Sequence, residues 1–201
     1  SEIPCVTIDV ELPDKRAGWV SIDNTKAMSE MVELLFKNGH ENIMVISGKK
    51  NAGVTVDRMT GVFDAMQRRG KKLRQEDILY CDYSEQTAYE KTKDYLQKYG
   101  TARHTAFLCF SDLMALGTMK AIREAGYRIP EDFSVTGFDG IPITEYTTPP
   151  LTTVWQDMKA NGYAGAKLLQ DRIKGKKTAS HSTLPYKLVQ RESVRNICGQ
   201  K

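Results

Sequence analysis

The sequence predicts an α/β protein with parallel sheets that are covered by helices on both faces. Short apolar segments rich in β-branched residues alternate with longer segments whose apolar residues recur every three or four positions. A glycine follows each long segment, where a left-handed helix cap favours this residue. Strands that alternate with helices in this way form parallel sheets. These glycines are Gly39, Gly70, Gly100, Gly126 and Gly175.

The expected strands are short apolar runs bounded by polar or turn-forming residues. The run 133–138, for example, follows Pro130 and ends at Asp139-Gly140. Two closing strands, near 183–184 and 187–190, are expected after the last helix. The earlier strands cover 6–9, 19–22, 43–46, 78–81, 105–110, 133–138 and 152–154.

The expected helices are amphipathic and cover 25–38, 55–69, 84–99, 113–125 and 158–173. In the first helix, one side carries Met28, Met31, Val32 and Leu35. In the second helix, the apolar residues that we expect to face inward are Val56, Met59, Phe63 and Met66.

Polar side chains follow four of the expected strands at their carboxyl ends: Asp9, Tyr83, Ser111 and Asp139. Because parallel strands share a direction, these side chains should line one rim of the sheets, where ligands of α/β proteins collect. Carboxylates accept hydrogen bonds from sugar hydroxyls, and an aromatic face covers the C–H surface of a sugar. The rim therefore suits a small polyhydroxylated ligand.

Arg58 adds a forked donor to this set. It falls in the first turn of the helix expected over 55–69, where a cation opposes the helix dipole, so local stability does not explain it. Structural alternatives remain for every member. Asp9 and Asp139 could cap turns, and Ser111 could be the N-cap of the next helix, which is the favoured role for this serine. Tyr83 could cover an edge of the core, and Arg58 could face solvent.

Charge and hydropathy exclude some classes of function. A formal net charge of +4 is too small to indicate a polyanion partner. The basic clusters at 68–72 and 174–177 fall at expected helix ends, where cations complement the dipole and face water. The sequence has no apolar run of about 18 residues, so no membrane span is expected.

Catalytic and metal-binding motifs are not found. The sequence has no P-loop, no G-x-S-x-G and no His/Cys metal spacing, so we expect no enzyme, no cofactor and no metal. His40 is expected to be structural, and His104 and His181 to lie at the surface. The cysteines are expected to be buried thiols in a reducing compartment: Cys5, Cys81, Cys109 and Cys198.

Several motifs together carry a resemblance to one family. The segments IPEDFSVTGFD (129–139) and PPLTTV (149–154) resemble near-signatures of the effector-binding core of lactose-repressor/galactose-repressor (LacI/GalR) transcription regulators. Four more matches follow the family's order and spacing over almost the whole chain. They are Val20-x-x-Asp23-Asn24, Asn38-Gly39-His40, Arg58-x-x-Gly61 and Ser111-Asp112-x-x-Ala115-x-Gly117, with a closing strand LVQRES at 188–193.

The resemblance implies a type I periplasmic-binding-protein-like fold, with two Rossmann-like lobes joined by three crossovers. The first lobe would be incomplete, so that its remaining pieces lack sheet neighbours, and a helix-turn-helix headpiece would be absent. The chain therefore looks amino-terminally truncated. The implied ranges are 1–20 and 156–184 for the first lobe, and 21–153 and 186–198 for the second.

The resemblance also implies roles in effector binding for several rim residues. Asp9 would hold a sugar from the first lobe, Arg58 would grip hydroxyls or a carboxylate, and Tyr83 would form an aromatic wall. Asp139 is the first acid after Gly-Phe, and Gln156 occupies a polar pocket position after the PPLTTV strand. The sequence departs from the family at Ser111, where asparagine is common, and at Met158, where a larger aromatic is often found.

The function implied is that of the effector-sensing, dimerising core of a cytoplasmic bacterial repressor. A sugar-like effector would shift the population of lobe arrangements and so change operator affinity, through a headpiece outside this chain. The alternative is an exported periplasmic sugar-binding protein, with an enzyme on this scaffold a distant third. The expected homodimer would form through 141–148 and the helix 113–125, whose interface residues are Leu113, Leu116, Gly117, Met119 and Lys120.

Overall fold

The strands form two separate sheets in the computed structural model, which describes residues 3–12 and 17–199. The smaller sheet is parallel and has the order β1-β2-β8, from β1 (Val6–Ile8), β2 (Gly18–Ile22) and β8 (His181–Leu184). The larger sheet has the order β4-β3-β5-β6-β7-β9 and is parallel except for β9. Its strands are β3 (Ile43–Ser47), β4 (Ile78–Tyr80), β5 (Ala106–Cys109), β6 (Ser134–Asp139), β7 (Thr152–Gln156) and β9 (Tyr186–Val189).

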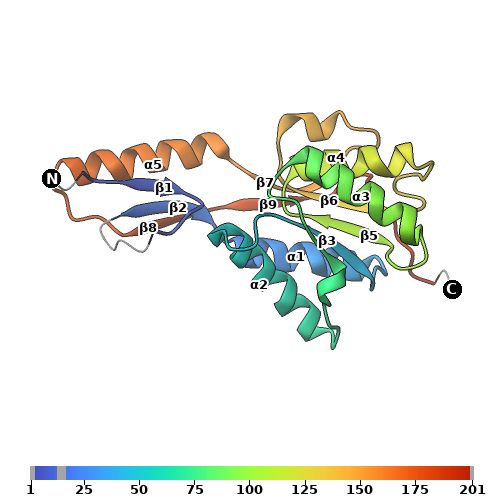
Figure 1. Cartoon of the computed structure of the whole chain (residues 1–201). Coiled ribbons are helices and arrows are strands. Elements are labelled where there is room, and N and C mark those ends of the chain that lie inside the picture. Colours follow the sequence, from blue (N-terminus) through green and yellow to red (C-terminus); the bar gives the residue numbers. More distant parts are fainter. Residues whose placement is uncertain (1–2, 13–16, 200–201) are drawn as a thin grey trace.

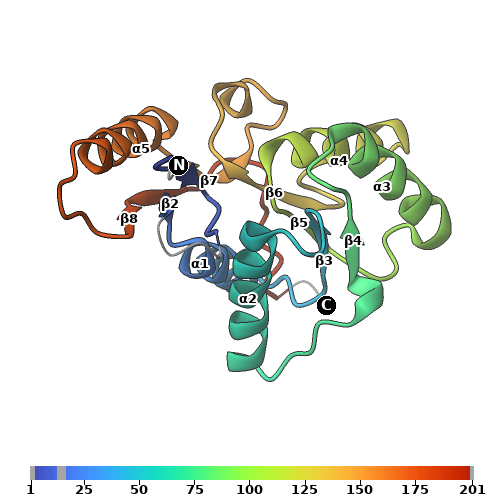
Figure 2. The same ribbon diagram turned by 60° about the vertical axis from the view of Figure 1, so that its left-hand side comes forward.

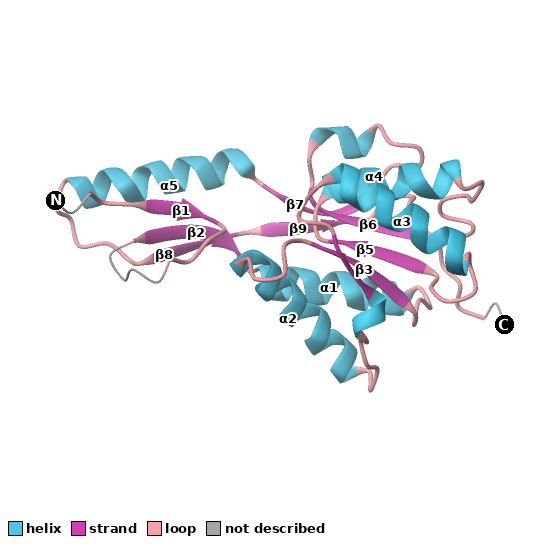
Figure 3. Cartoon of the chain, in the orientation of Figure 1, coloured by secondary structure: helices cyan, strands magenta, loops and turns pink. Residues whose placement is uncertain are grey.

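Helices cover both faces of the larger sheet and one face of the smaller one (Figures 1 and 3). The pair α1 (Asn24–Lys37) and α2 (Gly53–Arg68) packs together on one side of the larger sheet. The pair α3 (Glu85–Tyr99) and α4 (Asp112–Glu124) packs on the other side, as Figure 2 shows after rotation. Helix α5 (Met158–Ile173) lies on the smaller sheet. The predicted α/β class with parallel sheets is confirmed.

Short connecting elements complete the fold. Two 3-10 helices, η1 (Gln75–Asp77) and η2 (Pro142–Glu145), precede β4 and follow β6. The five glycines expected at helix ends all have positive φ. Among the described residues, no helix is both long and apolar enough to cross a membrane.

The main hydrophobic core lies between the larger sheet and its two helix pairs. Every residue of β3 and β5 is buried, as expected for strands covered on both faces. The predicted buried side of α1 is confirmed, because none of its four apolar residues is exposed: Met28, Met31, Val32 and Leu35.

The predicted inward face of α2 is partly wrong. Val56 and Phe63 are 51% and 47% exposed, whereas Met66 is buried as expected. The helix is turned so that Gly61 meets α1, where a Cβ on this glycine would lie 2.2 Å from the Thr25 carbonyl oxygen. The close contact of α2 with α1 at Gly61 therefore decides which side of α2 faces inward. The apolar pattern of the helix does not predict that side.

The chain passes between the sheets at three places. β2 leads into α1, β7 leads into α5, and β8 leads into β9, which continues across the junction in Figure 1. β2 stays in the smaller sheet as far as Ile22, past the predicted boundary at residue 20. The pieces of the first lobe were expected to lack sheet neighbours, but β1, β2 and β8 pair with one another. Residues 1–2 and 13–16 of that predicted lobe lie outside the described residues.

The expectation of four buried cysteines is half correct. Cys81 and Cys109 are buried free thiols, whereas Cys5 and Cys198 are exposed. Burial raises the pKa of Cys81 to about 11, so this thiol stays protonated and unreactive near neutral pH. His40 is structural as predicted, since its ring nitrogens contact the Thr105 hydroxyl at 2.9 Å and the Arg195 carbonyl oxygen at 3.0 Å.

Gly117→Ala should destabilise the fold, because α4 meets the start of α3 at this glycine. A Cβ there would lie 2.2 Å from the Glu85 carbonyl oxygen, so the backbones must separate. We expect a loss of about 2–3 kcal/mol in the free energy of unfolding, measured by urea denaturation. Gly162→Ala in α5 is the matched control, because its Cβ would enter open space. The control should stabilise by up to about 1 kcal/mol; equal effects of the two variants would contradict the packing argument.

Candidate functional site

The guanidinium of Arg58 is buried between α2, β5 and β6. Its Nε donates to the side-chain oxygen Oδ1 of Asn24 at 2.9 Å, and one terminal nitrogen donates to the backbone carbonyl oxygen of Phe110. The guanidinium carbon lies 3.7 Å from the centre of the Phe138 ring. Arg58 is 3% exposed, so the solvent-facing alternative is wrong. Because α2 begins at Gly53, Arg58 falls in the second turn, and the predicted conflict with the first-turn dipole does not apply.

Asp139 ends β6 and faces this guanidinium. Its Oδ1 lies 3.6 Å from a terminal nitrogen of Arg58 and accepts a hydrogen bond from Nε2 of Gln156 at 3.0 Å. Burial raises the pKa of Asp139, and the Arg58 charge opposes this rise. The backbone φ of 114° is a strained value for a residue with a side chain. These contacts are made across the sheet and differ from those of a local turn cap.

Asp9 brings a second carboxylate from the smaller sheet. It follows β1 with a φ of 59°, and its Oδ1 is buried without a hydrogen-bond partner among the described residues. Burial raises its pKa, whereas the Arg58 charge and a hydrogen bond from Asn24 lower it. Asn24 thus interacts both with Arg58 of α2 and with Asp9 beside the smaller sheet, and Asp9 presents an acceptor near Arg58 that is unpaired among the described residues.

Tyr83 lies at the same rim, after β4. Its hydroxyl is 2.9 Å from the Thr55 hydroxyl, and its ring covers Gly48, where a Cβ would lie 2.1 Å from a ring carbon. Burial raises the pKa of this phenol, with Arg58 acting in the opposite direction. The φ of 61° at Tyr83 is again in the left-handed region. The ring is therefore held by α2 and by the close approach to the glycine after β3.

Ser111 has the structural role that the sequence favoured. Its hydroxyl accepts from the Met114 backbone N–H at 3.3 Å, as the N-cap of α4. The next residue, Asp112, is fully buried and supports the rim through hydrogen bonds. Its carboxylate accepts from the Ile141 backbone N–H at 2.8 Å and from the Thr153 hydroxyl at 2.6 Å. Asp112 thereby fixes the segment that follows Asp139.

Gln156 is the last residue of β7 and connects Asp139 to α5. Its side chain is 2% exposed, and its carbonyl oxygen accepts from Nδ2 of Asn161 at 3.0 Å. Of the predicted ligand-binding residues, Arg58, Asp139 and Gln156 are thus in direct contact. Asp9 and Tyr83 lie close enough to Arg58 for its charge to lower the pKa of each, against the effect of burial.

Three residues of this network were not predicted as site residues: Asn24, Thr55 and Asn161. Asn24 stands inside the quoted motif with Asp23 and could have been found there. Asn161 offers only a weak signal, namely a polar residue on the inward face of a helix. The set combines donors and acceptors at the carboxyl ends of strands from both sheets. Among the described residues, no group of three or more metal-ligating side chains occurs.

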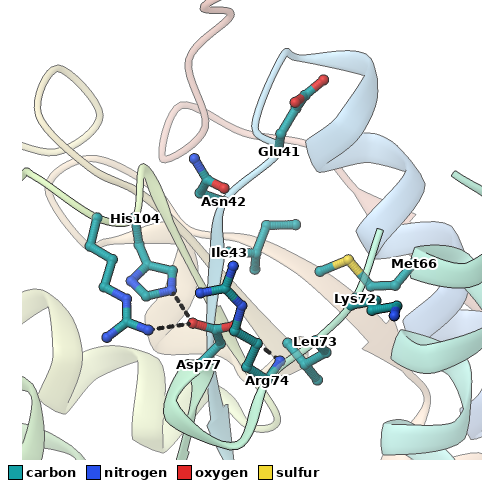
Figure 4. Close-up of a pocket in the computed structure, with 10 residues that line it drawn as sticks. Glu41, Asn42, Ile43, Met66, Lys72, Leu73, Arg74, Asp77 and His104 are labelled. Atoms are coloured by element: carbon teal, nitrogen blue, oxygen red, sulfur yellow. Dashed lines mark hydrogen bonds and ion pairs between the residues drawn. The ribbon is translucent and has the colours of Figure 1, made fainter. Parts of the chain in front are cut away.

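A pocket of about 130 Å³ lies at the opposite end of the strands of the larger sheet, near the start of β3 (Figure 4). Asp77 accepts from Nε2 of His104 at 3.0 Å, and the Tyr95 hydroxyl lies 2.7 Å from Nδ1. Burial lowers the pKa of His104 and raises that of Tyr95 to about 12. His104 is 3% exposed, so its predicted surface position is wrong. These groups satisfy one another, which indicates a structural network rather than a ligand site.

The predicted interface helix is only partly at the surface. Met119 is 1% exposed and Gly117 packs against α3, so neither has surface for a partner, and both are removed from the predicted interface. Leu113 is 49% exposed, and Leu116 and Lys120 are also accessible. The apolar spacing of the helix reflected its contact with α3.

The two sheets, their three connecting passages and the polar rim are those of a periplasmic-binding-protein-like fold. A family model described as "Periplasmic binding protein-like domain" matches residues 32–194. The chain belongs to this family, within the LacI-type transcriptional regulators.

Known relatives support this placement. The transcriptional repressor PurR of Actinobacillus pleuropneumoniae serotype 3 (strain JL03) is 32% identical over 200 residues, which cover 98% of this chain and 59% of that protein. The repressor CytR of Escherichia coli (strain K12) is 31% identical over 195 residues, with 96% and 57% covered. A LacI family regulator from Enterococcus faecium, crystallised with bound ribose, matches with a TM-score of 0.84 and 25% identity, covering 96% of this chain and 71% of that one. The chain thus spans about three fifths of the length of these two relatives.

Asp112→Asn should change how stability depends on pH. Burial raises the pKa of Asp112 from 3.8 to about 7. Between these values the folded protein keeps a proton that the unfolded chain has lost, so the free energy of unfolding falls as pH rises, by up to roughly 4 kcal/mol. Asparagine can accept from Ile141 and donate to Thr153 without this penalty. Urea unfolding at pH 5 and pH 8 should show a smaller loss for the variant; identical losses in the two proteins would refute this.

Proposed function

We propose that this chain is the effector-sensing core of a bacterial transcription repressor. A small sugar-like ligand binds at the rim between the two sheets and contacts Asp9, Arg58, Tyr83, Asp139 and Gln156. Ser111 supports this rim as a helix cap. The observation that carries the proposal is the buried contact of Arg58, Asp139 and Gln156 at a passage between the sheets, beside an unpaired carboxylate oxygen of Asp9.

The mechanism that we propose is a population shift. Asp9 follows β1 of the smaller sheet, whereas Arg58 on α2 and Asp139 on β6 lie on the side of the larger sheet, so a ligand that contacts all three favours arrangements that bring them together. The effect on operator affinity is limited by the ligand's differential affinity for those arrangements. Proposed lobes are 1–20 with 156–184, and 21–153 with 186–198. The shared sheet membership of β1, β2 and β8 supports this division.

The proposal extends to partners and location. DNA would be bound by a headpiece outside this chain, in the cytoplasm, as the names of the repressor relatives suggest. We propose no catalytic activity, because the relatives are named as transcriptional regulators. The same relatives favour a repressor over an exported sugar-binding protein.

We also propose that the chain forms a homodimer through one apolar patch. Leu113, Ile143 and Tyr146 are 49%, 50% and 78% exposed and come from the start of α4 and from η2 with its cap. Leu116 and Lys120 continue the patch along α4. Exposed apolar residues gathered in this way mark interaction sites more often than isolated ones do.

Asp139→Asn should weaken ligand binding while preserving the shape of the site. Loss of a charged hydrogen-bond partner costs about 1.5–3 kcal/mol, so affinity should fall roughly ten- to a hundred-fold. Titration calorimetry with a panel of pentoses, hexoses and nucleosides, beginning with D-ribose, tests this. Asp171→Asn is the control, because Asp171 is an acid on α5 that pairs with Lys176 away from the site. Wild-type affinity in the Asp139 variant would remove this residue from the site.

Tyr146→Glu combined with Ile143→Glu should dissociate the homodimer. Two charges in an apolar interface lose their hydration without a partner, which is unfavourable by several kcal/mol. Sedimentation velocity over a range of micromolar concentrations should show a dimer for the wild type and a monomer for the variant. Val56→Glu provides the control, because Val56 is equally exposed but lies on α2. A monomeric wild type at high micromolar concentration would refute the homodimer.

A further inference from the structure

Asn161 carries a buried acceptor that no described group satisfies. The residue lies on α5 and is 1% exposed, and its Oδ1 has no hydrogen-bond partner among the described residues. Its amide group is engaged on the other side, where Nδ2 donates to the Gln156 carbonyl oxygen at 3.0 Å. Buried side-chain acceptors without a partner are uncommon in folded proteins, and each needs an explanation.

The orientation of the Asn161 amide is fixed by the carboxylate of Asp139. An ionised carboxylate only accepts hydrogen bonds, so Gln156 must turn its NH₂ group towards Asp139. The Gln156 carbonyl oxygen then faces Asn161, which must in turn present its own NH₂ group. Rotating the Asn161 amide would set two carbonyl oxygens against each other. The free atom of Asn161 is therefore its oxygen, and a donor is needed to satisfy it.

The position of Asn161 places this oxygen at the same end of the smaller sheet as Asp9. Gly165, one turn later on the same face of α5, lies over Val6 and Ile8 of β1. Helix α5 runs opposite to β1, so its first turns lie above the carboxyl end of the strand (Figure 1). Asp9 comes directly after Ile8 and also carries an oxygen without a hydrogen-bond partner among the described residues. Both free acceptors thus belong to the smaller-sheet side of the rim.

The opposite side of the rim offers donors. A terminal nitrogen of Arg58 lies 3.6 Å from Asp139, which is longer than a hydrogen bond. The Tyr83 and Thr55 hydroxyls use one of their two hydrogens for the bond between them, so one hydroxyl hydrogen of this pair is available to a ligand. A ligand that fits both sides needs O–H or N–H groups towards Asp9 and α5, and acceptor atoms towards α2. A polyol or a nucleoside has this distribution.

We propose that Asn161 is a specificity-determining residue whose Oδ1 accepts a hydrogen bond from a hydroxyl or amine of the effector. This inference rests on the proposed function and adds a contact residue and a chemical requirement to it. Because the same amide holds Gln156, the contact is linked through Gln156 to Asp139 and Arg58. A structural role alone would require only the Nδ2 donor and would leave the oxygen unexplained.

The test compares ligands that differ by one hydroxyl. The full chain is titrated with D-ribose and adenosine and with their monodeoxy analogues, using wild type, Asn161→Leu and Asn161→Asp. In the wild type, removal of the hydroxyl that meets Asn161 should weaken binding at least ~10-fold. Asn161→Leu, which lacks the acceptor, should bind the parent ligand at least ~10-fold more weakly and bind parent and analogue within ~2-fold of each other.

Asn161→Asp separates contact from positioning. The aspartate keeps an acceptor but loses the donor to Gln156, so it should still discriminate between the hydroxyl and deoxy forms. If Asn161 acts only by holding Gln156, this variant loses discrimination as the leucine variant does, and the inference is overturned. Gly162→Ala on the same helix controls for changes in α5, and thermal unfolding confirms that each variant is folded.

The possible failures are distinguishable. If the wild type binds one of the probes and Asn161→Leu binds it equally well, with the same preference among analogues, the inference is wrong and the proposed function stands. If the wild type binds neither D-ribose nor adenosine, the proposed function fails for these ligand classes, and the inference fails with it. Retained discrimination in the aspartate variant would support the contact even if the leucine variant did not fold.

Discussion

The buried guanidinium of Arg58 is the constraint on which the rest of the site depends. An uncompensated charge in a protein interior is unfavourable by several kcal/mol, so its surroundings must supply acceptors in fixed positions. Here they come from α1, from the end of β5 and from the end of β6, through Asn24, Phe110 and Asp139. The Phe138 ring covers one face of the group. Pairing one cation therefore fixes the separate elements of the larger sheet that any ligand at the rim would meet.

Rigidity of the larger sheet comes from close packing as much as from this charge. Gly61 and Gly117 let the helices of each pair approach at backbone distance, and a tightly packed interior deforms little. Asp112 ties the segment after β6 to β7 from below. The three passages between the sheets are single chain segments, held by side-chain contacts of Asn24, Gln156 and Tyr186. Motion that responds to a ligand should therefore concentrate at these passages, where few residues have to change conformation.

The sequence predicted the fold well wherever burial followed apolar spacing. The strands β3 and β5 and the inward side of α1 were correctly expected because their buried residues are predominantly apolar. For α2 the same reasoning failed, because its inward side carries Arg58 and Gly61, and an apolar pattern does not count either residue type. Met119 was misplaced for a related reason: a helix that is apolar on two sides was assigned a partner chain, whereas α3 covers one of those sides. His104 has no local signal, because its partner Asp77 lies 27 residues earlier.

The site was less predictable than the fold because its chemistry depends on contacts between distant segments. Strand ends could be located in the sequence, which placed Asp9, Tyr83 and Asp139 at one rim. The sequence could not predict in the same way which group donates and which group accepts in each hydrogen bond. Whether the Asn161 amide offers its oxygen or its nitrogen is decided by Gln156, and Gln156 is oriented by a carboxylate 17 residues before it. Asp139 thus determines, through the side-chain amides of Gln156 and Asn161, which hydrogen-bonding group α5 presents at the rim. Replacing Asp139 by a residue without an acceptor would therefore remove the constraint on the orientation of the Asn161 amide.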